Sequence, residues 1–95
     1  MKLLTLIYDA SLENLVTPIF ERGMAVTRYS KIEGVTGARM DTLAGGEYAS
    51  EGQNTLILVI ADDGTMEGIV AELRALREQV GHGLRGVVTN AETVI

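Results

Sequence analysis

The chain has no cysteine and a single histidine. The absence of cysteine excludes disulfides, thiolate metal sites and cysteine nucleophiles, and it fits a reducing compartment. The histidine, His82, is the one candidate base for a serine–histidine–acid triad, and none of Ser11, Ser30 and Ser50 lies in a G-x-S-x-G motif. The sequence also lacks a P-loop and an H-E-x-x-H motif. These absences disfavour an enzyme.

Long hydrophobic runs are missing as well. The first apolar run, residues 3–8, is too short for a signal peptide and stops at Asp9. No run approaches the roughly 20 residues of a membrane span, so we expect a soluble, cytoplasmic protein. The net charge is −5 and the eight basic residues are scattered. Nucleic acid is therefore not an expected partner, because phosphate binding needs clustered lysine and arginine.

The 95 residues, 46% of them hydrophobic, predict one folded domain over residues 1–95. Apolar and β-branched segments predict strands, and apolar stripes at three- and four-residue spacing predict helices. The expected strands are residues 2–8, 25–32, 55–61 and 85–89, with helices at 12–20 and 66–80. This β-α-β-β-α-β order is typical of an α+β, ferredoxin-like fold, in which two helices cover one face of a four-stranded antiparallel sheet.

The third strand, TLILVIA at residues 55–61, is apolar on both faces and is expected at the centre of the sheet. The two helices cover one face of that sheet, so the apolar side chains of the other face need a different cover. This pattern indicates an oligomer that buries the free sheet face.

Residues 38–54 have no clean hydrophobic period and contain several glycines and acidic residues. A segment of this length without its own structure is unusual in a compact domain and is often a binding loop. We therefore predict that the 38–54 loop is the working part of the molecule.

The sequence has two glycine-rich segments. Residues 34–39 lie at the start of this loop, and residues 81–86 follow the second helix. Glycines allow backbone N–H groups to approach a ligand closely, and Arg85 offers a positive charge for a phosphate. The simpler interpretation is a strand end at 34–37 and a helix C-cap with a tight turn at 81–83, which is common for glycine. Both interpretations stay open from the residues alone.

The residues present disfavour two further chemistries. Acylphosphatases have this size and element order, but they need an arginine in a phosphate-cradling loop after the first strand, where this chain has acids. Asp62 and Asp63 are expected to form a turn and cap the second helix. His82 with Asp62, Asp63 or Glu92 offers at most a weak oxygen-rich metal site, and no metal centre is expected.

Taken together, these segments resemble the PII family of trimeric signalling proteins, in particular its PII-like members with shortened loops. Residues 21–23, 34–37 and 81–83 stand where that family has its E-x-G, G-F-G and G-D-G elements. Residues 55–63 resemble the third strand of the family and the Asp-Asp turn that follows it. The resemblance spans nearly the whole chain.

The resemblance implies a non-enzymatic, homotrimeric regulatory protein of nitrogen regulation, with an adenine nucleotide (AMP, ADP or ATP) as effector in clefts between subunits. The 38–54 loop corresponds to the family's partner-binding loop, here facing a partner protein such as a membrane transporter. The implied ligand-binding residues are Gly34, Gly37, Ala38, Arg39, Gly81, His82, Gly83 and Arg85.

The sequence also departs from the family pattern. Leu84 or Arg85 stands where the family has a lysine, and no pair of basic residues follows the last strand up to Ile95. These departures leave room for a less charged nucleotide, another small effector or no ligand. The rival hypotheses are a ligand-free ferredoxin-like interaction module and a small enzyme of the same fold.

Overall fold

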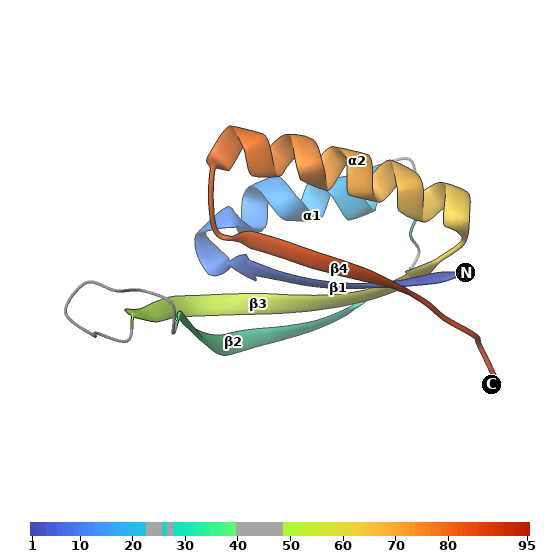
Figure 1. Cartoon of the computed structure of the whole chain (residues 1–95), viewed down its shortest axis with the longest axis horizontal. Helices are drawn as coiled ribbons and strands as arrows, with labels where there is room; N and C mark the ends of the chain where they lie inside the picture. Colours follow the sequence, from blue (N-terminus) through green and yellow to red (C-terminus); the bar gives the residue numbers. More distant parts are fainter. Residues whose placement is uncertain (23–25, 27, 40–48) are drawn as a thin grey trace.

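The computed structural model describes residues 1–22, 26, 28–39 and 49–95, with the backbone alone for 38–39 and 49–52 (Figure 1). Its elements follow the order β-α-β-β-α-β, with a short 3₁₀ turn, η1, before the first helix. They are β1 (Lys2–Asp9), η1 (Ala10–Leu12), α1 (Glu13–Glu21), β2 (Ser30–Arg39), β3 (Ala49–Ala61), α2 (Asp63–Val80) and β4 (Leu84–Asn90).

The four strands form an antiparallel sheet in the order β2-β3-β1-β4. Both helices lie on one face of this sheet (Figure 1). The ferredoxin-like arrangement expected from the sequence is thereby confirmed, as is the central place of residues 55–61. No helix in the described part of the chain is long and apolar enough to cross a membrane.

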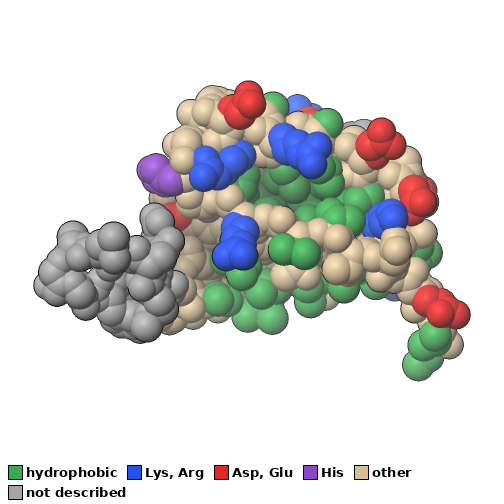
Figure 2. Space-filling view, in the orientation of Figure 1, with side chains coloured by type: hydrophobic (Ala, Val, Ile, Leu, Met, Phe, Trp, Pro, Cys, Tyr) green, Lys and Arg blue, Asp and Glu red, His purple; other side chains and the backbone are tan. Residues whose placement is uncertain are grey.

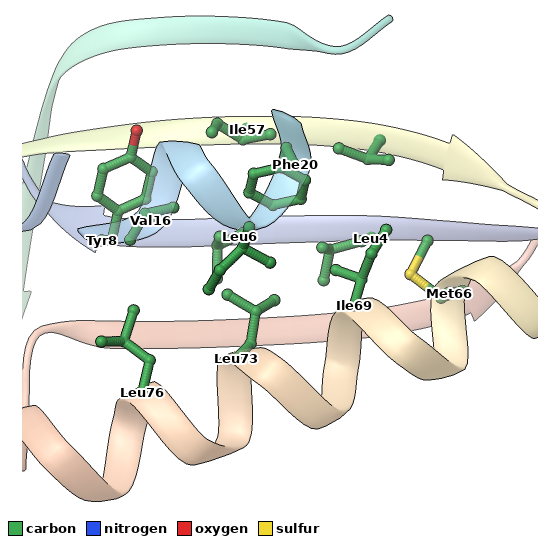
Figure 3. Close-up of a cluster of buried hydrophobic side chains, with 12 residues drawn as sticks. Leu4, Leu6, Tyr8, Val16, Phe20, Ile57, Met66, Ile69, Leu73 and Leu76 are labelled. Carbon is green, nitrogen blue, oxygen red and sulfur yellow. The ribbon is translucent and has the colours of Figure 1, made fainter. Parts of the chain in front are cut away.

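The core lies between the sheet and the two helices (Figure 3). β1 alternates strictly, so that Leu4, Leu6 and Tyr8 are buried beneath the helices while the residues between them face the other way. α2 contributes a stripe at three- and four-residue spacing, which is the face an amphipathic helix buries. The stripe consists of Met66, Ile69, Leu73 and Leu76.

The ends of α2 are fixed by the residues that the sequence pattern indicated. Asp62 accepts a hydrogen bond from the backbone N–H of Thr65 at 2.7 Å, so it caps the N-terminus of the helix. Gly81 has φ of 80° in the left-handed region, and its N–H donates to the carbonyl of Arg77 at 2.9 Å. The capping interpretations of Asp62 and of Gly81 are both confirmed.

The predicted bounds of the second strand and of the long loop were wrong. β2 covers Ser30–Arg39 rather than 25–32, so Gly34 and Gly37 lie inside the strand instead of ending it. β3 begins at Ala49, and residues 49–54 pair with β2. Both ends of the 38–54 segment are therefore paired with each other as a two-stranded ribbon. Residues 40–48, between these ends, lie outside the described residues. The hydrophobic pattern missed the ribbon because backbone pairing without a core beneath it leaves no period in the side chains.

The sheet face opposite the helices is apolar and uncovered in the single chain. Its exposed side chains come from all four strands, and they alternate with the core residues of the same strands. They are Ile7, Ile32, Leu58, Ile60 and Val87, of which Ile60 is 54% exposed. A contiguous apolar face of this kind is a mark of an interaction surface.

The left-handed C-cap gives a matched pair of glycine substitutions. Gly81→Ala places a Cβ at φ of 80° and should lower the free energy of unfolding by about 1–2 kcal/mol. Gly68→Ala lies inside α2 with nothing within 4 Å of the new Cβ, and should raise the free energy of unfolding by about 0.5–1 kcal/mol. Urea unfolding of both variants measures this, and equal effects would contradict the cap.

Candidate functional site

Three segments meet at one end of the sheet. β1 ends there at Asp9, which pairs with Asn54 of β3, and the N–H of Asp9 donates to the carbonyl of Gly83 at 2.8 Å. Beyond Asn54 the β2–β3 ribbon continues past the end of β1 (Figure 1). The turn from α2 to β4 and the base of the ribbon therefore share this end of the sheet.

The turn from α2 to β4 is built around two glycines with positive φ. Gly81 and Gly83 have φ of 80° and 79°, values that favour glycine. A Cβ on Gly83 would also lie 3.3 Å from the Cβ of Asp9 and 3.4 Å from a methyl of Leu12. The tight packing of Gly83 against β1 and η1 leaves His82 at the exposed tip of the turn.

The charges near this turn are mixed. Asp9 accepts a hydrogen bond from the N–H of Ser11 at 2.9 Å, and this bond, aided by the charge of nearby His82, holds the pKa of the Asp9 carboxyl below its usual value. Arg85 is exposed and pairs with Ile7, which places it on the open face of the sheet. The turn therefore offers a cation on the open face and a carboxylate close to the glycines.

The other predicted site residues lie at the base of the ribbon. The register of β2 against β3 shifts between Ile32 and Val35 and again between Thr36 and Gly37, and Gly34 takes φ of 74° at the first shift. Ala38 and Arg39 pair through their backbones with Ser50 and Ala49. These irregularities bend and twist the ribbon at the point where it leaves the sheet.

The two predicted groups do not form one pocket within a chain. β2 and β4 are the opposite edges of the sheet, separated by β3 and β1. Three strand spacings put these edges about 14 Å apart. Gly34, Gly37, Ala38 and Arg39 thus share an end of the sheet with Gly81, His82, Gly83 and Arg85, but each group lies open on its own edge.

Sequence reasoning missed a polar network beside the core. The Glu13 carboxylate of α1 accepts hydrogen bonds from the Tyr8 hydroxyl at 2.5 Å, from the Lys31 ammonium at 2.5 Å and from the Thr17 hydroxyl at 2.9 Å. This one carboxylate therefore ties α1 to β1 and to the edge strand β2. The sequence held a partial signal, because Glu13 and Thr17 are one helical turn apart.

The network shifts the proton affinities of its members in the directions that charge pairing requires. The Lys31 ammonium and the Tyr8 hydroxyl hold the pKa of Glu13 below its ordinary value, and Glu13 raises the pKa of Lys31. Burial, followed by the neighbouring carboxylate, raises the pKa of Tyr8. At neutral pH the arrangement is a salt bridge with a neutral phenol beside it, which suits a structural role.

The weak metal site that the sequence left open does not form. Asp62 and Asp63 lie at the start of α2 and His82 lies just past its end. The 18 residues of this helix separate them by about 27 Å. Among the described residues, no group of three or more histidine, aspartate or glutamate side chains is placed to share a metal ion.

The fold and the arrangement of this end of the sheet define a ferredoxin-like domain with a projecting hairpin. No family model matches the chain, and no curated protein matches its sequence. Its structure is similar to that of CPII, a nitrogen regulatory PII-like protein from Thiomonas intermedia K12, in complex with ADP, AMP and bicarbonate. That match has a TM-score of 0.72 and 12% identity, and it covers 98% of this chain and 94% of CPII.

Two other solved structures are similar. A PII-like signalling protein from Thermus thermophilus has a TM-score of 0.57 at 16% identity, covering 95% of this chain and 84% of that one. A phage SAM lyase in complex with S-methyl-5′-thioadenosine has a TM-score of 0.62 at 15% identity, and the match covers 93% of this chain and 79% of the lyase chain. The chain therefore has the PII-like fold that its motifs indicated, a fold found in signalling proteins and in at least one enzyme.

Glu13 predicts a specific acid response. Its carboxyl pKa is lowered from 4.5, so the stability it contributes is present above that pH and is lost as pH falls through the folded-state value. Glu13→Gln should cost roughly 1 kcal/mol at pH 7, a charged hydrogen-bond contribution discounted for solvent exposure.

The measurement is the free energy of unfolding in urea at several pH values between 3 and 7. The difference between wild type and Glu13→Gln should shrink at the acidic end. Glu78→Gln, on the exposed surface of α2, is the control and should stay within about 0.5 kcal/mol of wild type. A pH-independent loss in Glu13→Gln would show that packing, not charge, links α1 to β2.

Proposed function

We propose that this chain is a non-enzymatic PII-like regulatory protein that binds an adenine nucleotide at the end of the sheet where the β4 turn and the β2–β3 ribbon begin. In this proposal the site is completed between subunits of a homotrimer. The observation that carries it is the placement of two glycine-rich, ligand-accessible segments at the same sheet end but on opposite edges.

The placement on opposite edges explains why the site needs a second chain. A ligand on the Gly81–Gly83 turn has the β4 edge on one side and solvent on the other. The β2 edge of a neighbouring subunit, with Gly34 and Gly37 at its irregular part, supplies the missing wall. Arg85 gives the turn a cation for a phosphate, and Gly81, which has nothing within 4 Å of where its Cβ would be, provides backbone that a ligand is able to approach closely.

The open apolar sheet face supports the assembly. Its exposed side chains, from Ile32 on one edge to Val87 near the other, favour burial against equivalent faces of other subunits. A closed cyclic assembly would satisfy this face and would bring the Gly81–Gly83 turn of one chain next to the irregular part of β2 in a neighbouring chain.

The solved structures favour the nucleotide as effector. CPII, which is similar over nearly the whole chain, was determined with ADP, AMP and bicarbonate. In the proposal, ligand binding at the ribbon base changes what residues 40–48 present to a partner protein, such as a membrane transporter. The proposed ligand would contact the part of β2 that carries the two register shifts, and binding there would alter the bend of the ribbon.

A second candidate function is an enzyme that acts on an adenosine-containing substrate. The observation in its favour is the similarity to a phage SAM lyase bound to S-methyl-5′-thioadenosine. The same sheet end would bind the adenosine, and Tyr8 with Glu13 is the nearest acid–base pair. Tyr8 is fully buried, so this pair is poorly placed to meet a substrate. A ligand-free interaction module is the third candidate.

The nucleotide proposal predicts a defined loss of binding. Titration calorimetry with AMP, ADP and ATP should detect binding of at least one of these nucleotides. Arg85→Ala should weaken the affinity for that nucleotide about tenfold, because one charged hydrogen bond is lost. Gly83→Asp, which adds a carboxylate at a crowded position with φ of 79°, should abolish binding.

Arg28→Ala is the matched control, because Arg28 is exposed and precedes β2 at the opposite end of the sheet. It should leave nucleotide affinity unchanged. Absence of binding by all three nucleotides, with the wild type folded, would favour the ligand-free module. Turnover of S-adenosylmethionine by the wild type would favour the enzyme.

The assembly proposal has its own test. Ile60→Glu places a charge in the middle of the open face, and light scattering should report a monomer in place of a trimer. Leu15→Glu is the control, because Leu15 is 45% exposed on α1, on the helical side of the molecule. It should leave the trimer intact, and a monomeric wild type would contradict the proposed assembly.

A further inference from the structure

A second uncovered apolar surface lies on the helical side of the sheet, between α2 and β4. It is a groove of about 800 Å³ whose floor includes Leu6, Leu73, Leu84 and Val88. Figure 2 shows hydrophobic side chains at the bottom of this hollow, with lysine and arginine side chains around it. This surface is separate from the open sheet face and from the glycine-rich turn.

The groove exists because α2 covers β1 rather than β4. Leu4 on β1 is 1% exposed under the helix, whereas Val88, its partner across the β1–β4 ladder, is 39% exposed. Gly86 has no side chain, and methyl groups of Leu4 and Leu6 lie 3.4 and 3.5 Å from where its Cβ would be, so leucines of β1 form the floor beside it. β4 is also the edge strand of the described sheet, so its outer backbone groups are available to another strand.

The rim of the groove is more basic than acidic. Arg74 and Arg77 line the α2 side and Lys2 lies at one end. Of the two acids on the rim, Asp63 forms an ion pair with the N-terminal ammonium at 2.9 Å, which leaves Glu67. The groove thus suits an extended, apolar segment that carries a negative charge.

The described chain contains one segment of that kind. Residues 91–95 follow β4 and extend away from the body (Figure 1). Val94 and Ile95 are 82% and 110% exposed, and Glu92 precedes them. β-branched residues favour an extended conformation, so the segment is suited to pair with a strand edge.

We propose that residues 91–95 of one copy bind as an extended strand in the groove between α2 and β4 of a second copy. Val94 and Ile95 bury themselves against the apolar floor, and Glu92 lies near the arginines of the α2 rim. The outer edge of β4 supplies backbone hydrogen bonds, as in strand addition at a free sheet edge.

Length supports this fit. Five extended residues span about 17 Å, and the groove follows α2 from Asp63 to Arg77, a rise of about 21 Å. The segment does not fit its own groove, because it leaves β4 beside Met1, where the N–H of Ala91 donates to the Met1 carbonyl. To enter its own groove, the backbone would have to reverse at Ala91 and lose that hydrogen bond.

The natural lack of cysteine allows a direct test. Two single-cysteine versions of the full chain are prepared, Val94→Cys and Ala71→Cys, the latter on the groove side of α2, with an affinity tag on one of them. The mixed chains are treated with a short bismaleimide. The control is Gln79→Cys, an exposed position two turns further along α2 that lines the hollow beside α1 instead.

The tagged two-chain product should form about tenfold more with Ala71→Cys than with Gln79→Cys, because docking raises the local thiol concentration. An excess of untagged wild-type chain should compete for the groove and lower the yield of this product. Arg74→Glu in the chain that supplies the groove should also lower the yield. Equal products from the two positions would overturn the proposal. So would crosslinking within one chain that carries both Val94→Cys and Ala71→Cys, since the segment would then occupy its own groove.

Discussion

The pairing of β1 with β3 is the constraint on which the rest of the structure depends. Their ladder runs without a break from Lys2 opposite Ala61 to Asp9 opposite Asn54. Because side chains alternate along both strands, this register sends one set of residues under the helices and the other to the open face. A shift by one residue would exchange the two sets, so the core and the open apolar face are specified together.

Residues with a local physical signature were predictable from the sequence. The strand at 55–61, the stripe of α2, the Asp62 cap and the Gly81 C-cap each follow from side-chain chemistry within a few positions. These features made the fold predictable at low sequence identity to the solved structures.

Other features depend on contacts that no local pattern encodes. The ribbon of β2 and β3 beyond Asn54 is held by backbone pairing, which leaves no hydrophobic period to detect. Lys31 appears as an ordinary polar residue in a strand, yet it reaches the Glu13 carboxylate 18 positions away. The groove beside β4 arises because α2 covers β1 rather than β4, a property of packing that residue types alone do not determine.

The ribbon has a consequence for how the protein is able to diverge. Residues 49–53 pair with β2 and lie past the end of β1, so in the described chain their pairing adds nothing to the core beneath the helices. Substitutions in residues 49–53 that keep the backbone pairing therefore leave the packing beneath the helices unchanged. The outer ribbon and the helix-covered core are in this sense two separately variable parts of one sheet.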